Sequence, residues 1–567
     1  MSVNPAKQST NGKEEQKHEA KWTIMIYIAA DNDLEEEAIE DLKSMKKVGS
    51  TDDVNIIAQL DSRGRGNTFR FLLGDEQTAL YEDVVGDPLP EINTGDPREL
   101  TKFIVWGVDT YKAENYMLVL WGHGRGWEDL DNSDRVAAPT TDAVIYKKDP
   151  AEKGEGGENG QPDDNLSVAM TRQKEIRTFP NGGTVSQETK NTVENFAQQL
   201  NKRTGGGISR GMLTDLTTGE GFEISQDVLK MNELESALAE ARKRASAFRG
   251  HQTRQIDILG MDACLMGMVE VGHQIKKHVK YLVASEDAIP DEGWPYERIL
   301  NRLVKNPDMS PEYLAVTITR EFLLYYREKN MDVTKSACDL EQSGELTTAI
   351  QKLALELIDK ISANSGPVGA AILASRAMAQ TFYLKDYVDL YDFCSHLSRL
   401  CNNKEIEESC QYVMDVIHPK EPNAVNSEDK SQSISVEEHF VHSYGFIGHR
   451  LRDANGVSIY FPSFGPSPKY ADLPFAQEAK WVDFLKKLAG LFSKQGSSSE
   501  DSFESLGAPT VAVGGRVRAD HGTQQRIDQG TQQRLPAPLP RKIPKYHVAP
   551  PEEVKSVKTP TKKMTKK

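Results

Sequence analysis

The sequence predicts an α/β fold with a mostly parallel central sheet. Short apolar, β-branched runs bounded by polar turn residues indicate buried strands at residues 21–31, 54–61, 116–124 and 256–262. Amphipathic helical patterns separate several of these runs. Strands that alternate with helices form parallel sheets, and strands that helices cover on both faces are apolar throughout, as these are.

The N-terminal elements follow one another as strand, helix and strand. KWTIMIYIAAD at 21–31 is the first strand. The helix expected at 33–47 has apolar residues at three-to-four spacing, and Asp31 and Asn32 precede it as capping candidates. The elements expected next are strands at 54–61 and 68–74, a helix at 98–112 and the strand YMLVLWGHG at 116–124.

The same pattern returns later in the chain. IDILGMD at 256–262 precedes an expected helix at 264–276 and an apolar strand, VKYLVAS, at 279–285. Beyond residue 300 the pattern is mainly helical. The elements expected there are helices at 310–328, 341–362, 367–416 and 475–492, with one strand at 456–464.

Composition divides the chain into four parts. We expect residues 1–20 to be disordered, and also the basic tail at 495–567, which is rich in Ser, Gly and Pro. Between them we expect an α/β domain at 21–300 and a helical part at 301–494 that completes the fold. Residues 132–210, which are rich in Gly and charge, are expected to form a flexible insertion in the α/β domain.

Bulk composition favours a soluble protein. The chain is 38% hydrophobic and 27% charged, and no run approaches the roughly 18 apolar residues of a membrane span, so no membrane association is expected. The N-terminus lacks the apolar core of a secretion signal, which leads us to expect a cytoplasmic protein. Five scattered cysteines favour free thiols over a disulfide framework or a paired zinc motif.

The formal net charge of −16 is spread unevenly. Residues 495–567 carry 13 Lys and Arg against 7 Asp and Glu, so the tail is basic and the rest of the chain is strongly acidic. An acidic surface disfavours nucleic acid and attracts cationic substrates. We therefore expect protein or peptide partners, with nucleic acid limited to weak contacts of the tail.

Two expected strands end in residues that carry chemistry. VLWGHG places His123 after one strand, and ILGMDAC places Cys264 after another. Because the carboxyl ends of strands form the ligand crevice of an open α/β sheet, the two side chains meet there if the strands are neighbours. Cys264 is also expected to begin a helix, whose N-terminus favours a thiolate, and the amides of Gly124 and Cys264 are candidate oxyanion donors. A buried structural cysteine and a locally bonded histidine are the alternative.

Six segments give the sequence a resemblance to a known family. From residue 22 onward they are WTIMIYIAADNDLE, LVLWGHGRGW, DILGMDACLMGMVEV, ASEDAIPDEGWPY, SACDLEQ and GVSIYFPSF. They resemble the successive landmarks of the clostripain-like cysteine peptidases, a family grouped with caspases, legumains, gingipains and separases. The resemblance implies a caspase-like three-layer sandwich with a helical C-terminal extension. It also implies Cys264 as the nucleophile and His123 as its acid/base partner, with no cofactor required for the chemistry.

The resemblance also implies a substrate pocket. Asp262 stands where the family has an acidic wall of the S1 pocket, and a buried carboxylate there would select Arg or Lys at P1; capping of the next helix is its alternative role. Glu292 occupies the position of a second acid, with Asp291 beside it, and its longer side chain leaves the preference between Arg and Lys open. Trp294 is expected to line the pocket, with simple packing as the alternative.

The insertion at 132–210 is longer than the resemblance leads us to expect, and it falls where relatives are cut. The resemblance therefore implies a zymogen, activated by the protein itself or by an upstream protease, with a passive surface loop as the alternative. The candidate cleavage sites follow Lys147, Lys148, Lys153, Arg172, Lys174, Arg177, Lys202 and Arg203.

Calcium is left open as a ligand. Better-known secreted members of the family respond to calcium, and Asp31, Asn32 and Asp33 offer oxygen atoms after the first strand, although helix capping explains them equally well. We expect no other metal site. The sequence thus predicts a cysteine endopeptidase that cleaves after Arg or Lys. A noncatalytic caspase-like scaffold that recruits partners through its basic tail is the alternative.

Overall fold

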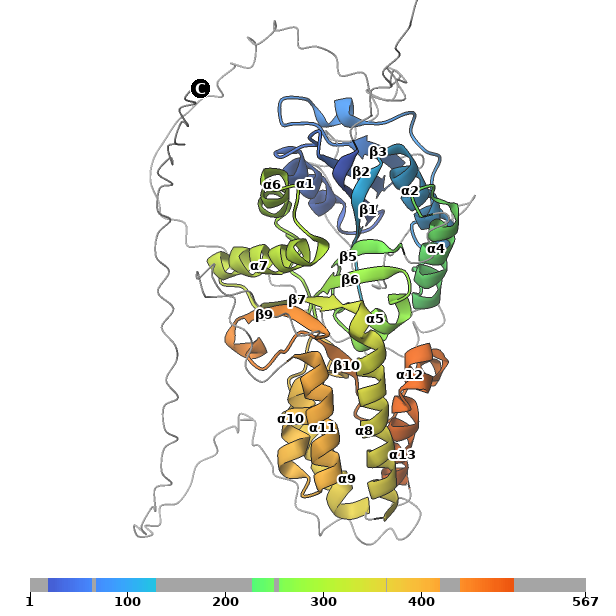
Figure 1. Cartoon of the computed structure of the whole chain (residues 1–567), viewed down its shortest axis with the longest axis vertical. Helices are drawn as coiled ribbons and strands as arrows, with labels where there is room; N and C mark the ends of the chain where they lie inside the picture. The colour runs from blue at the N-terminus through green and yellow to red at the C-terminus, as the bar shows by residue number, and fades with distance from the viewer. Residues whose placement is uncertain are drawn as a thin grey trace, which may run out of the picture. The chain divides into compact units, whose positions relative to one another are not determined.

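An eight-stranded sheet forms the centre of the part of the chain that the computed structural model describes, residues 19–63, 68–128, 227–248, 254–363, 365–418 and 439–493 (Figure 1). The strands lie in the order β3-β2-β1-β4-β5-β6-β7-β9. Their bounds are Ala20–Ala30 (β1), Val54–Ser62 (β2), Thr68–Leu72 (β3), Ala113–Trp121 (β4), Ile256–Asp262 (β5), Val279–Ala284 (β6), Val333–Asp339 (β7) and Val441–Ile447 (β9).

The five central strands β2, β1, β4, β5 and β6 are parallel to one another. The outer strands β3, β7 and β9 pair antiparallel to their neighbours. All of β1 except Lys21 is buried, which explains why its sequence is apolar along most of its length. The prediction of a mostly parallel sheet is confirmed.

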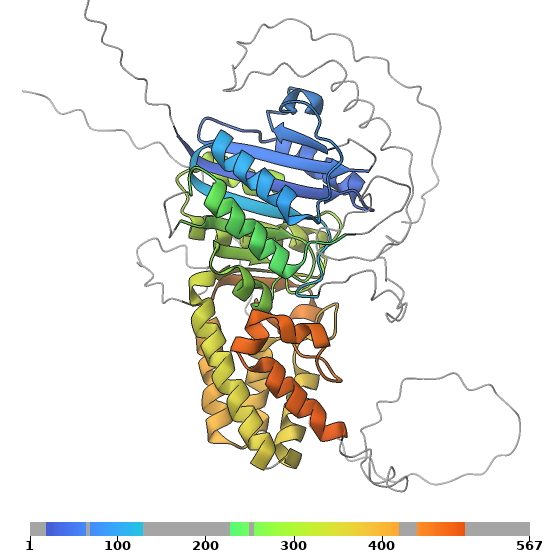
Figure 2. The ribbon, with the colours of Figure 1, turned by 90° about the vertical axis from the view of Figure 1, so that its right-hand side faces the viewer.

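Helices cover both faces of this sheet and make three layers (Figures 1 and 2). Alternate residues of β1 enter separate cores: Met25 and Tyr27 pack on the side of α2, α4 and α5, and Ile24 and Ile26 on the side of α1, α6 and α7. The expected caspase-like three-layer arrangement is confirmed. The bounds of these helices are Glu35–Lys46 (α1), Pro97–Thr110 (α2), Met231–Arg244 (α4), Val269–Ile275 (α5), Tyr296–Lys305 (α6) and Pro311–Lys329 (α7).

Local sequence signals set the ends of the longer helices. The Asp96 and Ser310 side chains accept backbone N–H hydrogen bonds at the starts of α2 and α7, where Pro97 and Pro311 occupy the first turn. Asn330 ends α7 in the left-handed conformation, with a φ of 54°. The chain can then turn back into β7 and extend the sheet.

Residues after 300 add β7 and β9 to the sheet and also form a helical C-terminal extension. The expected extension is confirmed, whereas the strand expected at 456–464 shortens to three residues in a separate two-stranded sheet. The extension consists of α8 (Ser343–Ala363), α9 (Ser365–Met378), β8 (Tyr387–Asp389), α10 (Leu390–Leu400), α11 (Lys404–Ile417), β10 (Ser458–Tyr460), α12 (Pro474–Glu478) and α13 (Trp481–Ser493).

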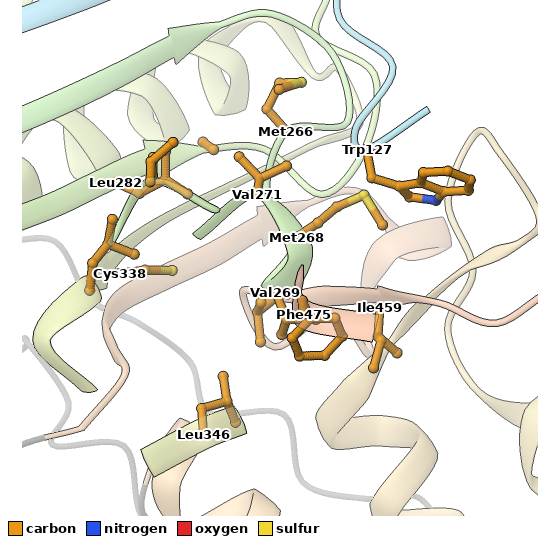
Figure 3. Packing of buried hydrophobic residues seen from close by; sticks show 14 of the residues in the cluster. Trp127, Met266, Met268, Val269, Val271, Leu282, Cys338, Leu346, Ile459 and Phe475 are labelled. Carbon is orange, nitrogen blue, oxygen red and sulfur yellow. The ribbon is translucent and has the colours of Figure 1, made fainter. Parts of the chain in front are cut away.

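The helix expected at 264–276 begins only at Val269, so that prediction is wrong for its first five residues. Leu265 has a φ of 67°, which no helix accommodates, and its N–H donates to the Asp287 carbonyl at 3.2 Å. The apolar residues that suggested a helix are buried instead between the sheet and the extension. Figure 3 shows Val269 beside Phe475 there.

Several predictions fall on other parts of the chain. The insertion at 132–210, its eight candidate cleavage sites and the tail at 495–567 lie outside the described residues. Of residues 1–20 only the last two are described, and Ala20 already belongs to β1. Within the described ranges, the helices are too short or too polar for one to cross a membrane. All five cysteines are free thiols.

Candidate active site

The strands that precede His123 and Cys264 are neighbours in the sheet. Trp121 at the end of β4 pairs with Asp262 at the end of β5, and each candidate residue follows its strand by two positions. The backbone continues the pairing, because Gly122 N–H donates to the Asp262 carbonyl at 3.1 Å. The structure therefore places His123 and Cys264 at the same edge of the sheet, as the sequence predicts.

Gly124 brings the two segments into direct contact. A Cβ atom built on Gly124 would lie 2.3 Å from the Cys264 carbonyl oxygen and 2.8 Å from its amide nitrogen. Any larger residue would push the segments apart. The two amides expected to hold an oxyanion, those of Gly124 and Cys264, thus belong to segments that contact each other.

Cys264 is partly buried in a turn, and its sulfur is held by the loop that follows β6. The Ile289 backbone N–H donates to Sγ at 3.3 Å, and the thiol lies 3.7 Å from the Ile289 carbonyl as a donor. A hydrogen bond donated to sulfur favours the thiolate. The expected support from the N-terminus of a helix is wrong, because α5 starts five residues later.

His123 is buried beside Asp33, a contact that the sequence analysis missed. The distance between His123 Nε2 and Asp33 Oδ1 is 2.6 Å. Asp33 follows β1, which lies next to β4, so the topology explains why the two residues meet. Knowing that β1 and β4 are neighbours would have predicted this pair, but the sequence does not give the order of the strands in the sheet.

The residues considered for calcium have other hydrogen bonds. Asn32 accepts from Leu34 N–H at 2.9 Å and donates to the Ala29 carbonyl at 2.8 Å, which is capping behaviour. Asp33 contacts His123. In the described part of the chain, no three His, Cys, Asp or Glu side chains are grouped so that they could hold a metal ion.

Asp262 is buried at the end of β5. Its Oδ2 accepts hydrogen bonds from the Trp294 backbone N–H at 3.1 Å and from the Tyr296 hydroxyl at 2.8 Å. These bonds connect it to the start of α6, so it does not cap α5. Burial raises the pKa of Asp262 to about 6, while the charge of Lys335 and the two hydrogen bonds act in the opposite direction.

The other residues expected in the S1 pocket are divided between the surface and the core. Gly293, with a φ of 56°, turns the chain between them. Asp291 and Glu292 are exposed before this turn, and Glu292 pairs with Lys329 at 3.0 Å. Trp294 is buried after it, under β5, so it packs rather than forming an open wall.

Two further titratable residues lie near Asp262, and no sequence pattern had indicated them. Asp41 on α1 accepts from Trp121 Nε1 at 2.7 Å, and a Cβ on Gly293 would approach both carboxyl groups within 3.2 Å. Burial, followed by the charge of Asp262, raises the pKa of Asp41 well above its ordinary value. The proton therefore favours Asp41 and leaves the charge on Asp262. The second residue is Lys335 on β7, which is also buried.

Comparisons with known proteins identify the family to which the chain is similar. The model of the clostripain family, peptidase family C11, matches residues 26–143 and 215–488. Clostripain of Hathewaya histolytica is 23% identical over 511 residues, which cover 80% of this chain and 77% of clostripain.

Two solved structures align over most of their length. A secreted C11 cysteine protease from Bacteroides thetaiotaomicron, bound to an irreversible peptide inhibitor, is 16% identical with a TM-score of 0.47, and the alignment covers 82% of this chain and 99% of that one. An inactive zymogen C11 protease from Parabacteroides distasonis is 20% identical with a TM-score of 0.46, over 81% and 98%.

One prediction about location is corrected by these comparisons. The matched B. thetaiotaomicron protein is described as secreted. The expected cytoplasmic location, which rested on the polar N-terminus, is therefore wrong on this comparison and is not retained.

Proposed function

The chain belongs to the clostripain family of cysteine proteases, and from this premise we propose that it is an endopeptidase that cleaves after Arg or Lys through Cys264 and His123. The observation that carries the proposal is the contact of the segments after β4 and β5, where Gly124 lies against Cys264. A nucleophile, an acid/base group and two candidate oxyanion amides then belong to two segments in direct contact.

The reaction follows from these positions. The Cys264 thiolate forms a bond to the scissile carbonyl carbon, and the amides of Gly124 and Cys264 hold the resulting oxyanion. When the intermediate collapses, the C–N bond breaks and His123 gives its proton to the leaving amine. His123 then takes a proton from water, which hydrolyses the thioester and releases Cys264.

Asp33 has a positioning role in this proposal. Its carboxylate faces His123 Nε2 at 2.6 Å, which fixes the plane of the ring and stabilises the imidazolium. Nδ1 is then the ring nitrogen that serves the reacting groups. The proposed machinery is therefore a dyad with an orienting acid, built from the carboxyl ends of the three adjacent strands β1, β4 and β5.

Asp262 supports the proposed preference for a cationic P1 residue. It is buried two residues before the nucleophile, with its proton affinity opposed by hydrogen bonds and by Lys335. An ionised buried carboxylate binds a guanidinium or ammonium group better than a neutral side chain. Glu292 lies at the surface with Lys329, so it contributes less than Asp262, and both Arg and Lys remain acceptable at P1.

We further propose that the chain is made as a zymogen. The family match is interrupted between residues 143 and 215, a segment that largely coincides with the insertion expected at 132–210. A family member from P. distasonis is described as an inactive zymogen. Cleavage after a Lys or Arg of the insertion, by the protein itself or by an upstream protease, would then activate the enzyme.

Hydrolysis of fluorogenic peptides tests this function. The purified chain is assayed with Arg, Lys, Asp or Leu at P1, before and after limited nicking with trypsin, alongside Cys264→Ala. Cys401→Ala is the matched control, because it removes a thiol from the helical extension. We expect cleavage after Arg and Lys in the wild type and in the control, a rise on nicking, and none with Cys264→Ala. Absence of activity in every form would favour a noncatalytic scaffold.

A further inference from the structure

Lys335 is a buried lysine near the candidate active site. It lies in β7 and its relative exposure is 1%. Among the described residues its ammonium group has no hydrogen-bond partner. Nζ lies 4.2 Å from the centre of the Phe322 ring and 4.9 Å from that of Trp294. Aromatic faces attract a cation, but they replace only part of the hydration that the ammonium group loses.

Burying the Lys335 ammonium group therefore costs folding free energy. Val333 and Ala337, its neighbours on the same face of β7, belong to the apolar core that α6 and α7 cover. A methionine would fill the same volume without a charge to desolvate. A buried cation that packing does not require points to an electrostatic partner nearby.

Asp262 and Cys264 are the two groups whose negative charge would stabilise this cation. Trp294, just before α6, connects this cation to Asp262. Its ring lies under Lys335 Nζ, and its backbone N–H donates to Asp262. Cys264 follows Asp262 by two residues at the end of β5. Burial lowers the pKa of Lys335, which is about 7 even though the charges of Asp262 and then Cys264 oppose this decrease.

Asp41, Tyr296 and Tyr326 are further titratable groups near this point. Burial raises the pKa of Asp41 on α1 well above its ordinary value, which favours its neutral form. Tyr296, at the start of α6, donates its hydroxyl to Asp262, and Tyr326 on α7 donates to the Gly293 carbonyl at 2.7 Å. On the other side of β7, Lys335 pairs with Gly445 of β9, which has no side chain to titrate.

We propose that Lys335 is a positioning residue that acts as the shared internal counter-ion of Asp262 and Cys264. It holds the P1-binding carboxylate and the nucleophilic thiolate in their charged forms, and it compensates the buried charge of Asp262. This role rests on the proposed function, because it assumes that Cys264 is the nucleophile.

The pH profile of Cys264 alkylation tests the proposal. Iodoacetamide reacts with the thiolate, and the other four cysteines are buried, so peptide mapping by mass spectrometry reports on Cys264 in the folded chain. We expect Lys335→Met to move the midpoint of the profile upward by about 1 pH unit, since an adjacent opposite charge shifts an acid by 1 to 3 units. Lys335→Arg keeps the cation and should restore most of the shift. Lys280→Met, on β6, is the control and should leave the profile unchanged.

A purely structural role would give a different result. If Lys335 only fills space, Lys335→Met unfolds at the same or a higher temperature and its alkylation profile superimposes on that of the wild type. This result would overturn the proposal. Alkylation needs no peptidase activity, so a wild-type chain that hydrolyses no peptide would refute the proposed function and still leave the counter-ion role open to measurement.

Discussion

Two groups of buried carboxyl side chains differ in their partners. In the active-site group, Asp262 shares its surroundings with the cation Lys335. In the junction group, where the sheet meets the helical extension, Glu270, Glu286 and Asp389 are bound by backbone N–H groups, a tyrosine hydroxyl and an asparagine amide. The same residue types thus occur with and without a cation.

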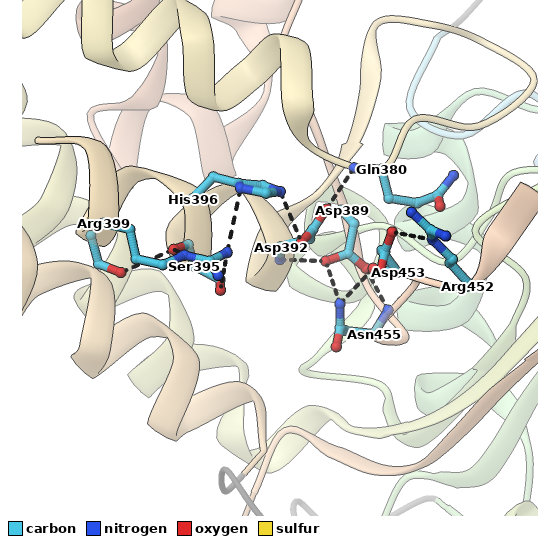
Figure 4. Close-up of polar contacts among 10 residues, drawn as sticks. Gln380, Asp389, Asp392, Ser395, His396, Arg399, Arg452, Asp453 and Asn455 are labelled. Atoms are coloured by element: carbon cyan, nitrogen blue, oxygen red, sulfur yellow. Dashed lines mark hydrogen bonds and ion pairs between the residues drawn. The ribbon is translucent and has the colours of Figure 1, made fainter. Parts of the chain in front are cut away.

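Burial favours the neutral form of each acid in the junction group. Burial raises the pKa of Glu270 to about 7 and that of Asp389 to about 7, and it raises the pKa of Glu286 well above its usual value. Figure 4 shows Asp389 at the start of α10, where Asn455 Nδ2 donates to it at 3.0 Å. A buried acid without a cation thus stabilises the fold as a neutral group, whereas one beside a cation keeps a charge that a substrate can use.

The largest effect is expected at the contact of Asp33 with His123, where an acid meets a titratable base. Asp33→Asn keeps the size of the side chain but removes the charge that stabilises the imidazolium. We expect kcat to fall by about 100-fold, in line with the loss of efficient acid/base catalysis, while KM changes little. Steady-state kinetics with a P1 Arg peptide measure this. Unchanged kcat would show that Asp33 is only a surface partner of His123.

The next largest effect is expected from Asp262→Asn, which removes the charge of the active-site group. The asparagine can still accept from Trp294 N–H and the Tyr296 hydroxyl, so the fold should persist. The value of kcat/KM for P1 Arg and Lys should fall by about 10- to 100-fold, as a charged hydrogen bond is lost. Peptides with P1 Leu should change little. An equal loss for all P1 residues would contradict a specificity role.

Glu270→Gln is the matched change in the junction group, and we expect it to alter stability rather than activity. The pKa of Glu270 in the folded protein, about 7, lies above its ordinary value of 4.5. Its stabilising contribution is therefore complete below pH 4.5 and is lost as the pH rises through 7, by up to about 3 kcal/mol. The variant should lose less stability than the wild type between pH 5 and 8 in thermal unfolding. Identical losses would show that Glu270 does not titrate in this range.

The smallest effect is expected from Glu292→Gln, in the exposed pair with Lys329. Surface ion pairs contribute about 0 to 1 kcal/mol, so unfolding should shift only slightly. The ratio of kcat/KM for P1 Arg to that for P1 Lys should change by less than about threefold. A change as large as that of Asp262→Asn would mean that Glu292 turns from Lys329 into the substrate pocket.

The central strands were predictable because each is a continuous apolar run, whereas β7 and β9 were not predicted. β7 (VTKSACD) carries polar residues and a lysine, and β9 is only partly buried, so neither has the pattern of a covered strand. The start of α5 was mispredicted since its apolar residues suit a helix equally well. Only tertiary packing sets Leu265 in a left-handed conformation.

The site was predictable to the extent that it depends on strand ends. His123 and Cys264 follow strands that proved to be neighbours, and a short sequence motif marks each. Asp33 was noticed but given other roles, because the position of β1 beside β4 was not known. Lys335 has no local signal at all, since its meaning depends on Asp262, 73 positions away in the sequence.

The central claim is that Cys264 is the nucleophile and that it reacts preferentially with substrates whose P1 residue is cationic. A peptidyl chloromethyl ketone with Arg at P1, added to the intact and to the nicked chain, tests it by peptide mapping in the mass spectrometer. The account predicts one adduct, on Cys264, that forms faster than with P1 Asp and is absent in Cys264→Ala. An adduct on another cysteine, or none on either form of the chain, would contradict it.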